Sequence, residues 1–146
     1  HYMLGTVKRQ RGDVDAALAA FRRAVELRST LAEAHLAIAQ ILQQRGRLDE
    51  AARAFDEHRR LSQRKADAQA STFAVGVGRE KQARGDLDGA RAQYELAIRL
   101  AADNPQAHYA LALLLWREGQ AAGARVHFAE ARRLAPWLRP PEGVRP

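Results

Sequence analysis

Residues 85–100 read GDLDGARAQYELAIRL, and this stretch decides the fold. A glycine can adopt the left-handed conformation that closes a preceding helix, and an aspartate shortly after it can cap the next helix. Beyond the aspartates, small, aromatic and branched residues recur at the i, i+4, i+7, i+8 spacing of one buried helix face: Ala90, Tyr94, Ala97 and Ile98. The stretch therefore predicts the turn and the second helix of a helix–turn–helix unit.

Three further glycines mark the same turn elsewhere. Gly12 and Gly46 lie 34 residues apart, as do Gly85 and Gly119, whereas the middle interval is 39 residues. A fixed period of this size is typical of stacked helix pairs. The small-then-aromatic spacing also recurs, as Ala17 with Phe21, Ala51 with Phe55, and Ala124 with Phe128. Two helices cross closely where a side chain is small, and one aromatic ring per unit fills the remaining space.

The composition agrees with an all-helical chain. Of the 146 residues, 47% are hydrophobic, largely alanine, and only 6% are aromatic. Alanine favours helix, and no alternating run of β-branched residues indicates a strand. This length is sufficient for one globular domain or one short solenoid with a buried core.

At this point the sequence resembles the tetratricopeptide repeat family, whose pattern is W-x2-L-G-x2-Y, then A-x3-F, then Pro. The Leu-Gly pair appears as Leu4-Gly5, Ile38-Ala39, Val77-Gly78 and Leu111-Ala112. The A-x3-F element appears in all four units, with Tyr94 as the aromatic residue of the third, and the closing proline survives only as Pro136. The resemblance implies an all-α, right-handed solenoid of four repeats and about eight helices.

The resemblance also divides the chain. We expect a single solenoid over residues 1–136, with repeats at approximately 1–30, 31–65, 71–104 and 105–136 and an insertion at about 66–70. Prolines are concentrated near the end, so we expect residues 137–146 to form an extended tail. Solenoids generally need polar caps. Both ends are therefore expected to expose apolar surface, covered by the remainder of a longer protein or by self-association, unless Trp137 and Leu138 fold back.

The junction between the second and third repeats departs from the pattern. His58 stands where the other repeats carry Ala24, Ala97 and Ala131, and the extra residues follow it. Residues 59–70 contain no Gly or Pro to stop a helix. We expect the second helix of the second repeat to be extended there, with a locally changed superhelix. The alternative is a continuous helix running on to Thr72, which would open the solenoid or exchange halves between chains.

Catalytic and metal chemistry find no support in the sequence. The absence of cysteine excludes disulfides, thiolate catalysis and cysteine-based zinc sites. His1, His35 and His108 occupy the same slot in different repeats, so they are a repeat apart and are expected to pack at the start of each first helix. No serine has a nucleophile-elbow context, and no carboxylate pair stands out as acid and base. We expect no enzyme, no cofactor and no metal site.

The resemblance instead implies a protein-interaction scaffold. In that family the first helix of each repeat lines a concave groove that receives an extended peptide or a helix. Matched by register, the groove residues are Tyr2, Thr6, Arg9, Leu36, Gln40, Gln43, Val75, Arg79, Gln82, Tyr109, Leu113 and Trp116. The aromatic side chains offer the flat area that dominates binding energy, the arginines favour a carboxylate, and the glutamines can pair with a peptide backbone.

The charge leaves two alternatives open. The chain carries 24 Lys+Arg against 17 Asp+Glu, a net charge of +7, with arginines scattered through every repeat. Binding of nucleic acid or an acidic partner through an arginine-rich convex surface is the first alternative. Its densest cluster, residues 59–65, has no interleaved aromatic residues for base stacking. The second alternative is a self-assembly module that forms a homo-oligomer through uncapped ends.

The location of the protein is not readable from the sequence. No apolar stretch approaches the roughly 18 residues that would span a bilayer, the longest being Leu111 to Trp116. No signal peptide is visible. The chain begins with His1 rather than Met, which is consistent with processing or with excision from a longer protein. The compartment therefore stays open, with the cytoplasm slightly favoured.

Overall fold

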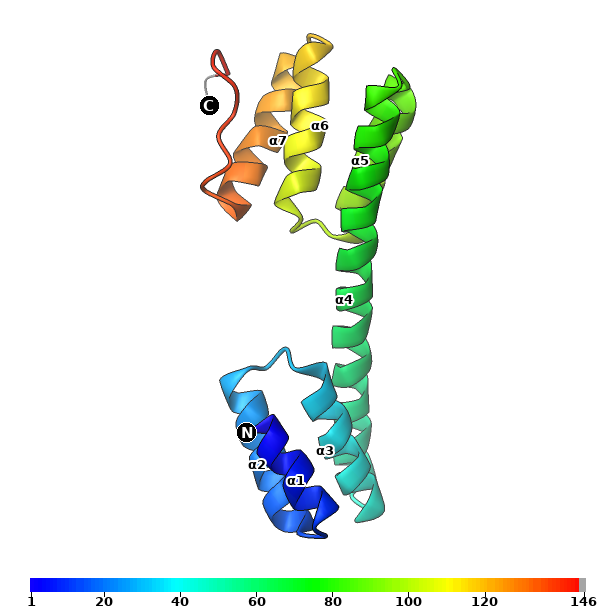
Figure 1. Cartoon of the computed structure of the whole chain (residues 1–146), viewed down its shortest axis with the longest axis vertical. Helices are drawn as coiled ribbons and strands as arrows, with labels where there is room; N and C mark the ends of the chain where they lie inside the picture. Colours follow the sequence, from blue (N-terminus) through cyan, green and yellow to red (C-terminus); the bar gives the residue numbers. More distant parts are fainter. Residues whose placement is uncertain (145–146) are drawn as a thin grey trace. The chain divides into compact units, whose positions relative to one another are not determined.

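The computed structural model describes residues 1–144, and over that range it is all-helical, with seven α-helices and no strand (Figure 1). This confirms the predicted all-α fold of helix pairs. The last two residues of the predicted tail, 145–146, lie outside the described residues. The helices are α1 (Tyr2–Gln10), α2 (Val14–Leu27), α3 (Ala32–Gln44), α4 (Leu48–Ala83), α5 (Leu87–Leu100), α6 (Pro105–Arg117) and α7 (Ala121–Leu134).

The four marker glycines form the turns that the sequence predicts. Their φ angles are +81° at Gly12, +71° at Gly46, +82° at Gly85 and +77° at Gly119, the left-handed region that closes a helix. The Asp13 and Asp86 side chains then accept hydrogen bonds from the backbone N–H groups of the first turns of α2 and α5. The start of α7 has no such side-chain cap, because a glutamine stands there.

The helix α4 differs from the main expectation. We expected the second helix of the second repeat to end near residue 70 and a new helix to start at 71. Instead one helix of 36 residues runs from Leu48 to Ala83, through the expected insertion at 66–70. It merges the second helix of one repeat with the first helix of the next, which is why there are seven helices rather than about eight. The alternative of a continuous helix is correct, and the helix continues beyond Thr72.

Side-chain size gives a physical reason for this continuity. His58 replaces the alanine that is 5% exposed in α2 and fully buried in α5 and α7. Phe73 occupies the register of Ala34 and Ala107, which are both 0% exposed, yet Phe73 is 75% exposed. A regular turn after residue 65 would bring two large side chains to positions where the other repeats have small ones. The continuous helix leaves Phe73 in solvent.

The chain forms two compact units, His1–Lys65 and Ala66–Pro146, each with its own core. In the first, Phe21 and Ile41 are almost fully buried and α2 packs on both α1 and α3. In the second, Tyr94 and Leu114 are buried, α5 packs on α6, and α6 packs on α7. In both units the aromatic residue of a second helix lies directly over a first-helix glycine. These cores fix the faces that the first helices present outward.

Two glycines in α4 provide a test of this packing. A Cβ atom at Gly78 would lie 2.5 Å from the Tyr94 ring, whereas a Cβ atom at Gly76 would meet nothing within 4 Å. We predict that Gly78→Ala lowers the free energy of unfolding by about 1–3 kcal/mol, because the buried ring must move. Gly76→Ala should instead raise it by roughly 0.5–1 kcal/mol through helix propensity.

The measurement is urea-induced unfolding followed by tryptophan fluorescence. Trp116 and Trp137 both lie in the second unit, so the signal reports on the unit that contains Tyr94. Equal effects of the two substitutions would contradict the packing described.

Candidate functional site

The first unit brings its predicted groove residues to neighbouring first helices. Tyr2, Thr6 and Arg9 lie on α1, and the other three, Leu36, Gln40 and Gln43, lie on α3. The Arg9 Nη1 atom donates to Gln40 Oε1 at 3.1 Å, which joins the two helices at their exposed faces. The same guanidinium lies 5.9 Å from the centre of the Phe21 ring. Arg9 is therefore oriented by a neutral amide and an aromatic ring, with its charge exposed.

The second unit repeats this arrangement. The Arg79 Nη2 atom on α4 donates to Gln106 Oε1 on α6 at 3.0 Å. Leu113 and Trp116 lie on α6, partly exposed and packed against the core. Gln82 is also on this side, but its Oε1 atom accepts a hydrogen bond of 2.8 Å from the Tyr94 hydroxyl. The surface thus combines one oriented arginine with partly exposed apolar side chains.

Val75 and Tyr109, two further predicted groove residues, are also engaged within the chain itself. Val75 is 3% exposed and belongs to the core, so its side chain does not reach a ligand. The Tyr109 hydroxyl donates to the Arg139 carbonyl at 3.0 Å, which ties α6 to the C-terminal segment. Sequence reasoning missed this contact, because Arg139 contributes only a backbone oxygen. Trp137 is 75% exposed and does not fold back, whereas Val144 is 7% exposed and packs in the core with Phe128.

The charges divide the arginines into two groups. Several arginines of the second helices and turns pair with nearby carboxylates, as in Arg23 with Glu26 at 2.7 Å and Arg133 with Glu130 at 2.6 Å. Within residues 1–144, by contrast, neither Arg9 nor Arg79 forms a salt bridge. Each unit thus has, on a first-helix face, an exposed arginine that lacks a carboxylate partner.

A pair of histidines is the most unusual polar feature of the second unit. The Nε2 atom of His108 lies 3.0 Å from the Ala102 carbonyl, so it carries the proton and donates. The Nδ1 atom of His108 then accepts from His127 Nδ1, at 3.0 Å. His35 makes the equivalent contact with the Ser29 carbonyl at 2.9 Å, so the role of this slot is packing against the preceding turn. Among the described residues, no group of three or more potential ligands could hold a metal ion.

This pair predicts a pH dependence. Burial lowers the pKa of His127 below its ordinary value, and the adjacent His108 acts in the same direction. The unfolded chain therefore takes up the proton first as the pH falls below about 6.5, so the folded state loses stability there and keeps it at higher pH. We predict a melting temperature a few degrees lower at pH 5 than at pH 7.5.

Calorimetry of two variants checks the assignment. His127→Gln should flatten the pH dependence, because it removes the titrating ring. Val126→Gln, at the neighbouring exposed position, should retain it. A wild-type melting temperature that does not change between these pH values would refute the prediction.

The structure defines an all-α protein of stacked helix pairs. Comparison with family models then identifies the family: a model described as tetratricopeptide repeat matches residues 2–70, and one described as TPR repeat matches residues 78–119. The chain belongs to the tetratricopeptide repeat family. Repeats of this kind build binding surfaces rather than catalytic sites, which supports the general role of a protein-interaction scaffold.

Several solved structures are similar to this chain. MamA is 20% identical, with a TM-score of 0.45, over 91% of this chain and 75% of that one. YrrB, described as a TPR protein with an unusual peptide-binding site, is 19% identical, with a TM-score of 0.43, over 90% and 66%. PilF of Pseudomonas aeruginosa is 20% identical, with a TM-score of 0.42, over 92% and 60%. No curated protein sequence matches significantly. Within the described residues, no helix is both long and apolar enough to cross a membrane.

Proposed function

We propose that this chain is a non-enzymatic scaffold whose first-helix faces bind an extended peptide or a helix that carries carboxylates. The observation that carries the proposal is the pair Arg9 and Arg79. Each is exposed, each is held by a glutamine of the next first helix, and neither has a carboxylate partner within residues 1–144. The same device is present in both compact units, so each unit offers a binding face of its own.

An arginine held in this way suits carboxylate recognition. Its planar guanidinium has five N–H donors in a fixed fork, and the glutamine uses one of them. The remaining donors can form charge-assisted hydrogen bonds with an Asp or Glu side chain. Because the glutamine already fixes the arginine, little further rotamer freedom is lost when a ligand binds.

Apolar side chains beside the arginines supply contact area. In the second unit, Leu113 and Trp116 lie on the same helix as Gln106 and are partly exposed. In the first unit, Tyr2 and Leu36 are also partly exposed. Large, partly buried aromatic side chains are the usual anchors of protein–peptide interfaces. A ligand with apolar residues and at least one carboxylate therefore fits these surfaces.

The arginines outside the first-helix faces support nucleic-acid binding less well than Arg9 and Arg79 support peptide binding. In the densest cluster, Arg59 pairs with Asp56, and Arg60 pairs with Glu57 at 2.5 Å. These carboxylates, one turn earlier on α4, offset much of the positive charge that phosphates would need. The proposal therefore rests on the first-helix faces alone.

The ligand class can be tested by selection. A display library of random peptides of about twelve residues would be selected on the immobilised chain at low salt. We predict enrichment of Asp or Glu together with apolar residues, and an affinity that falls about tenfold in Arg9→Gln or Arg79→Gln, because a charge-assisted hydrogen bond is lost. Fluorescence polarisation of a labelled, enriched peptide gives the dissociation constant.

Arg99→Gln is the matched control. Arg99 is exposed on the second helix α5 and, within the described residues, forms no salt bridge. Its removal lowers the net charge by the same amount and should change the dissociation constant less than about twofold. If all three variants bind equally well, or if the selected peptides lack carboxylates, the first-helix faces are not the binding site.

A further inference from the structure

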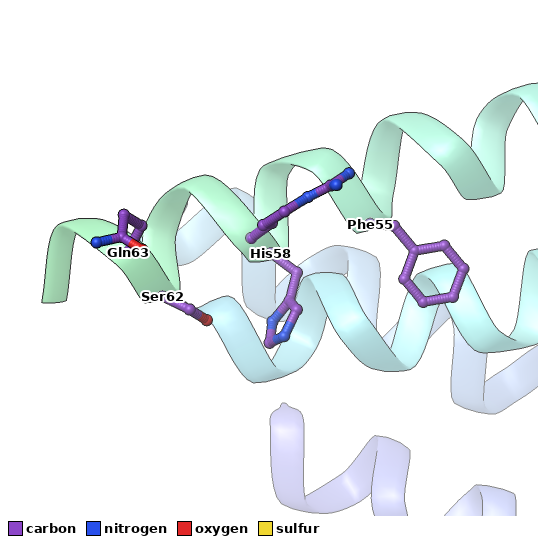
Figure 2. Close-up of a pocket in the computed structure, with 5 residues that line it drawn as sticks. Phe55, His58, Ser62 and Gln63 are labelled. Atoms are coloured by element: carbon purple, nitrogen blue, oxygen red, sulfur yellow. The ribbon is translucent and has the colours of Figure 1, made fainter. Parts of the chain in front are cut away.

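One aromatic residue of the four-repeat pattern lacks the cover that the others have. Phe21 and Tyr94 are 0% exposed and Phe128 is 4% exposed, whereas Phe55 is only partly buried. Phe55 lines an open cavity of about 440 Å³ together with His58, Arg59, Ser62 and Gln63, all on α4. Figure 2 shows Phe55 and His58 projecting from the same side of this helix. We call the N-terminal part of α4 that carries this cavity, residues 48–63, the open face of α4.

The other repeats show what covers such a face. Helix α2, which carries Phe21, packs on the following first helix α3. Helix α5, which carries Tyr94, packs in the same way on α6. Phe128 on α7 shares its core with Val144 of the C-terminal segment. In two of these three cases, the helix that packs on the second helix is the following first helix.

Helix α1 carries an apolar face with the required pattern. Met3, Leu4 and Val7 are 72%, 49% and 40% exposed. Their counterparts in α3, 34 residues later, are Ala37, Ile38 and Ile41, which are 5%, 8% and 1% exposed; those in α6 are Ala110, Leu111 and Leu114, at 6%, 4% and 1%. Helix α1 thus leaves in solvent the three positions that α3 and α6 bury.

The charges match as well. At the junction of α2 and α3, Arg45 Nη1 lies 2.5 Å from Asp15 Oδ1, and this contact lowers the pKa of Asp15. Arg11 stands 34 residues before Arg45, just after α1, and Asp49 stands 34 residues after Asp15, in the first turn of α4. The residues that fix the α2–α3 junction therefore have counterparts beside α1 and on the open face of α4.

We propose that α1 of a second copy of this chain packs on the open face of α4, in the way that α3 packs on α2. Met3, Leu4 and Val7 of the second copy would cover Phe55, and Arg11 of the second copy would pair with Asp49 of the first. Each first unit carries both surfaces, so the contact is head-to-tail and builds a chain or ring of copies.

The first-helix part of α4 in a second copy is less suited than α1 to pack on the open face of α4. Glu80 stands at the register of Ile41 and Leu114, and it pairs with Arg84 at 2.6 Å. Phe73 stands where α3 and α6 carry a buried alanine. The carboxylate of Glu80 opposes close packing on an apolar helix face, whereas α1 is apolar at all three matched positions. This difference selects α1.

The assembly is tested by sedimentation velocity of the full chain between about 1 μM and 1 mM, a range that covers weak head-to-tail contacts. The weight-average mass should rise with concentration above the monomer value of 16.2 kDa. Met3→Glu should lower the association constant about tenfold or more, because it buries a carboxylate beside Phe55. Val126→Glu, which alters a 67% exposed apolar residue of α7, is the matched control and should associate like the wild type.

A charge exchange tests the geometry. Arg11→Glu alone and Asp49→Arg alone should each weaken association, because like charges then face each other at the contact. An equimolar mixture of the two variants should associate like the wild type. When the two variants alternate along the assembly, positions 11 and 49 carry opposite charges at every contact. Circular dichroism of each variant checks that the helices are intact.

Three outcomes would overturn the proposal: a mass of 16.2 kDa at every concentration, equal association of Met3→Glu and wild type, or no recovery in the charge-exchanged mixture. Each of these is distinguishable from failure of the peptide proposal, because Met3, Arg11 and Asp49 are not among the groove residues.

Discussion

The contact between one aromatic ring and one missing side chain organises one helix pair in each unit. A Cβ atom at Gly5 would lie 2.7 Å from the Phe21 ring, and one at Gly78 would lie 2.5 Å from the Tyr94 ring. The two helices can approach so closely only because nothing larger stands there. This approach fixes the rotation of α1, and of the first-helix part of α4, about the helix axis. Which side chains face the core, the next repeat and solvent then follows from the spacing of 3.6 residues per turn.

This local dependence is why much of the fold could be predicted from the sequence. The turns need glycine at a positive φ angle, and Gly12, Gly46, Gly85 and Gly119 supply it at the predicted places. The buried face of each second helix needs small and aromatic residues one turn apart, which the sequence shows directly. Both signals act over a few residues, so reading them requires no knowledge of what lies elsewhere in the molecule.

The course of α4 could not be predicted in the same way. Residues 59–70 contain no glycine or proline that would end a helix. Whether the helix ends or continues there therefore depends on which side chains each of the two arrangements buries. The sequence shows that His58 is larger than the alanine of the other repeats, whereas the exposure of Phe73 is a property of the folded structure. His58 and Phe73 would meet only if a turn were formed, and they are far apart in the sequence. The continuation of α4 depends on both residues together, and neither residue alone predicts it.

The residues of the candidate site could likewise be predicted only in part from the sequence. The predicted groove residues lie on α1, α3, α4 and α6, but Val75 is buried in the core, and the carbonyl of Arg139 engages Tyr109. On α1, the proposed peptide-binding residues Tyr2, Thr6 and Arg9 follow the i, i+4, i+7 spacing of one face, whereas Met3 and Val7 each stand one position after Tyr2 and Thr6. A displacement of one residue rotates a side chain by about 100° around the helix axis. One short helix can therefore present a ligand face and a self-association face that do not compete.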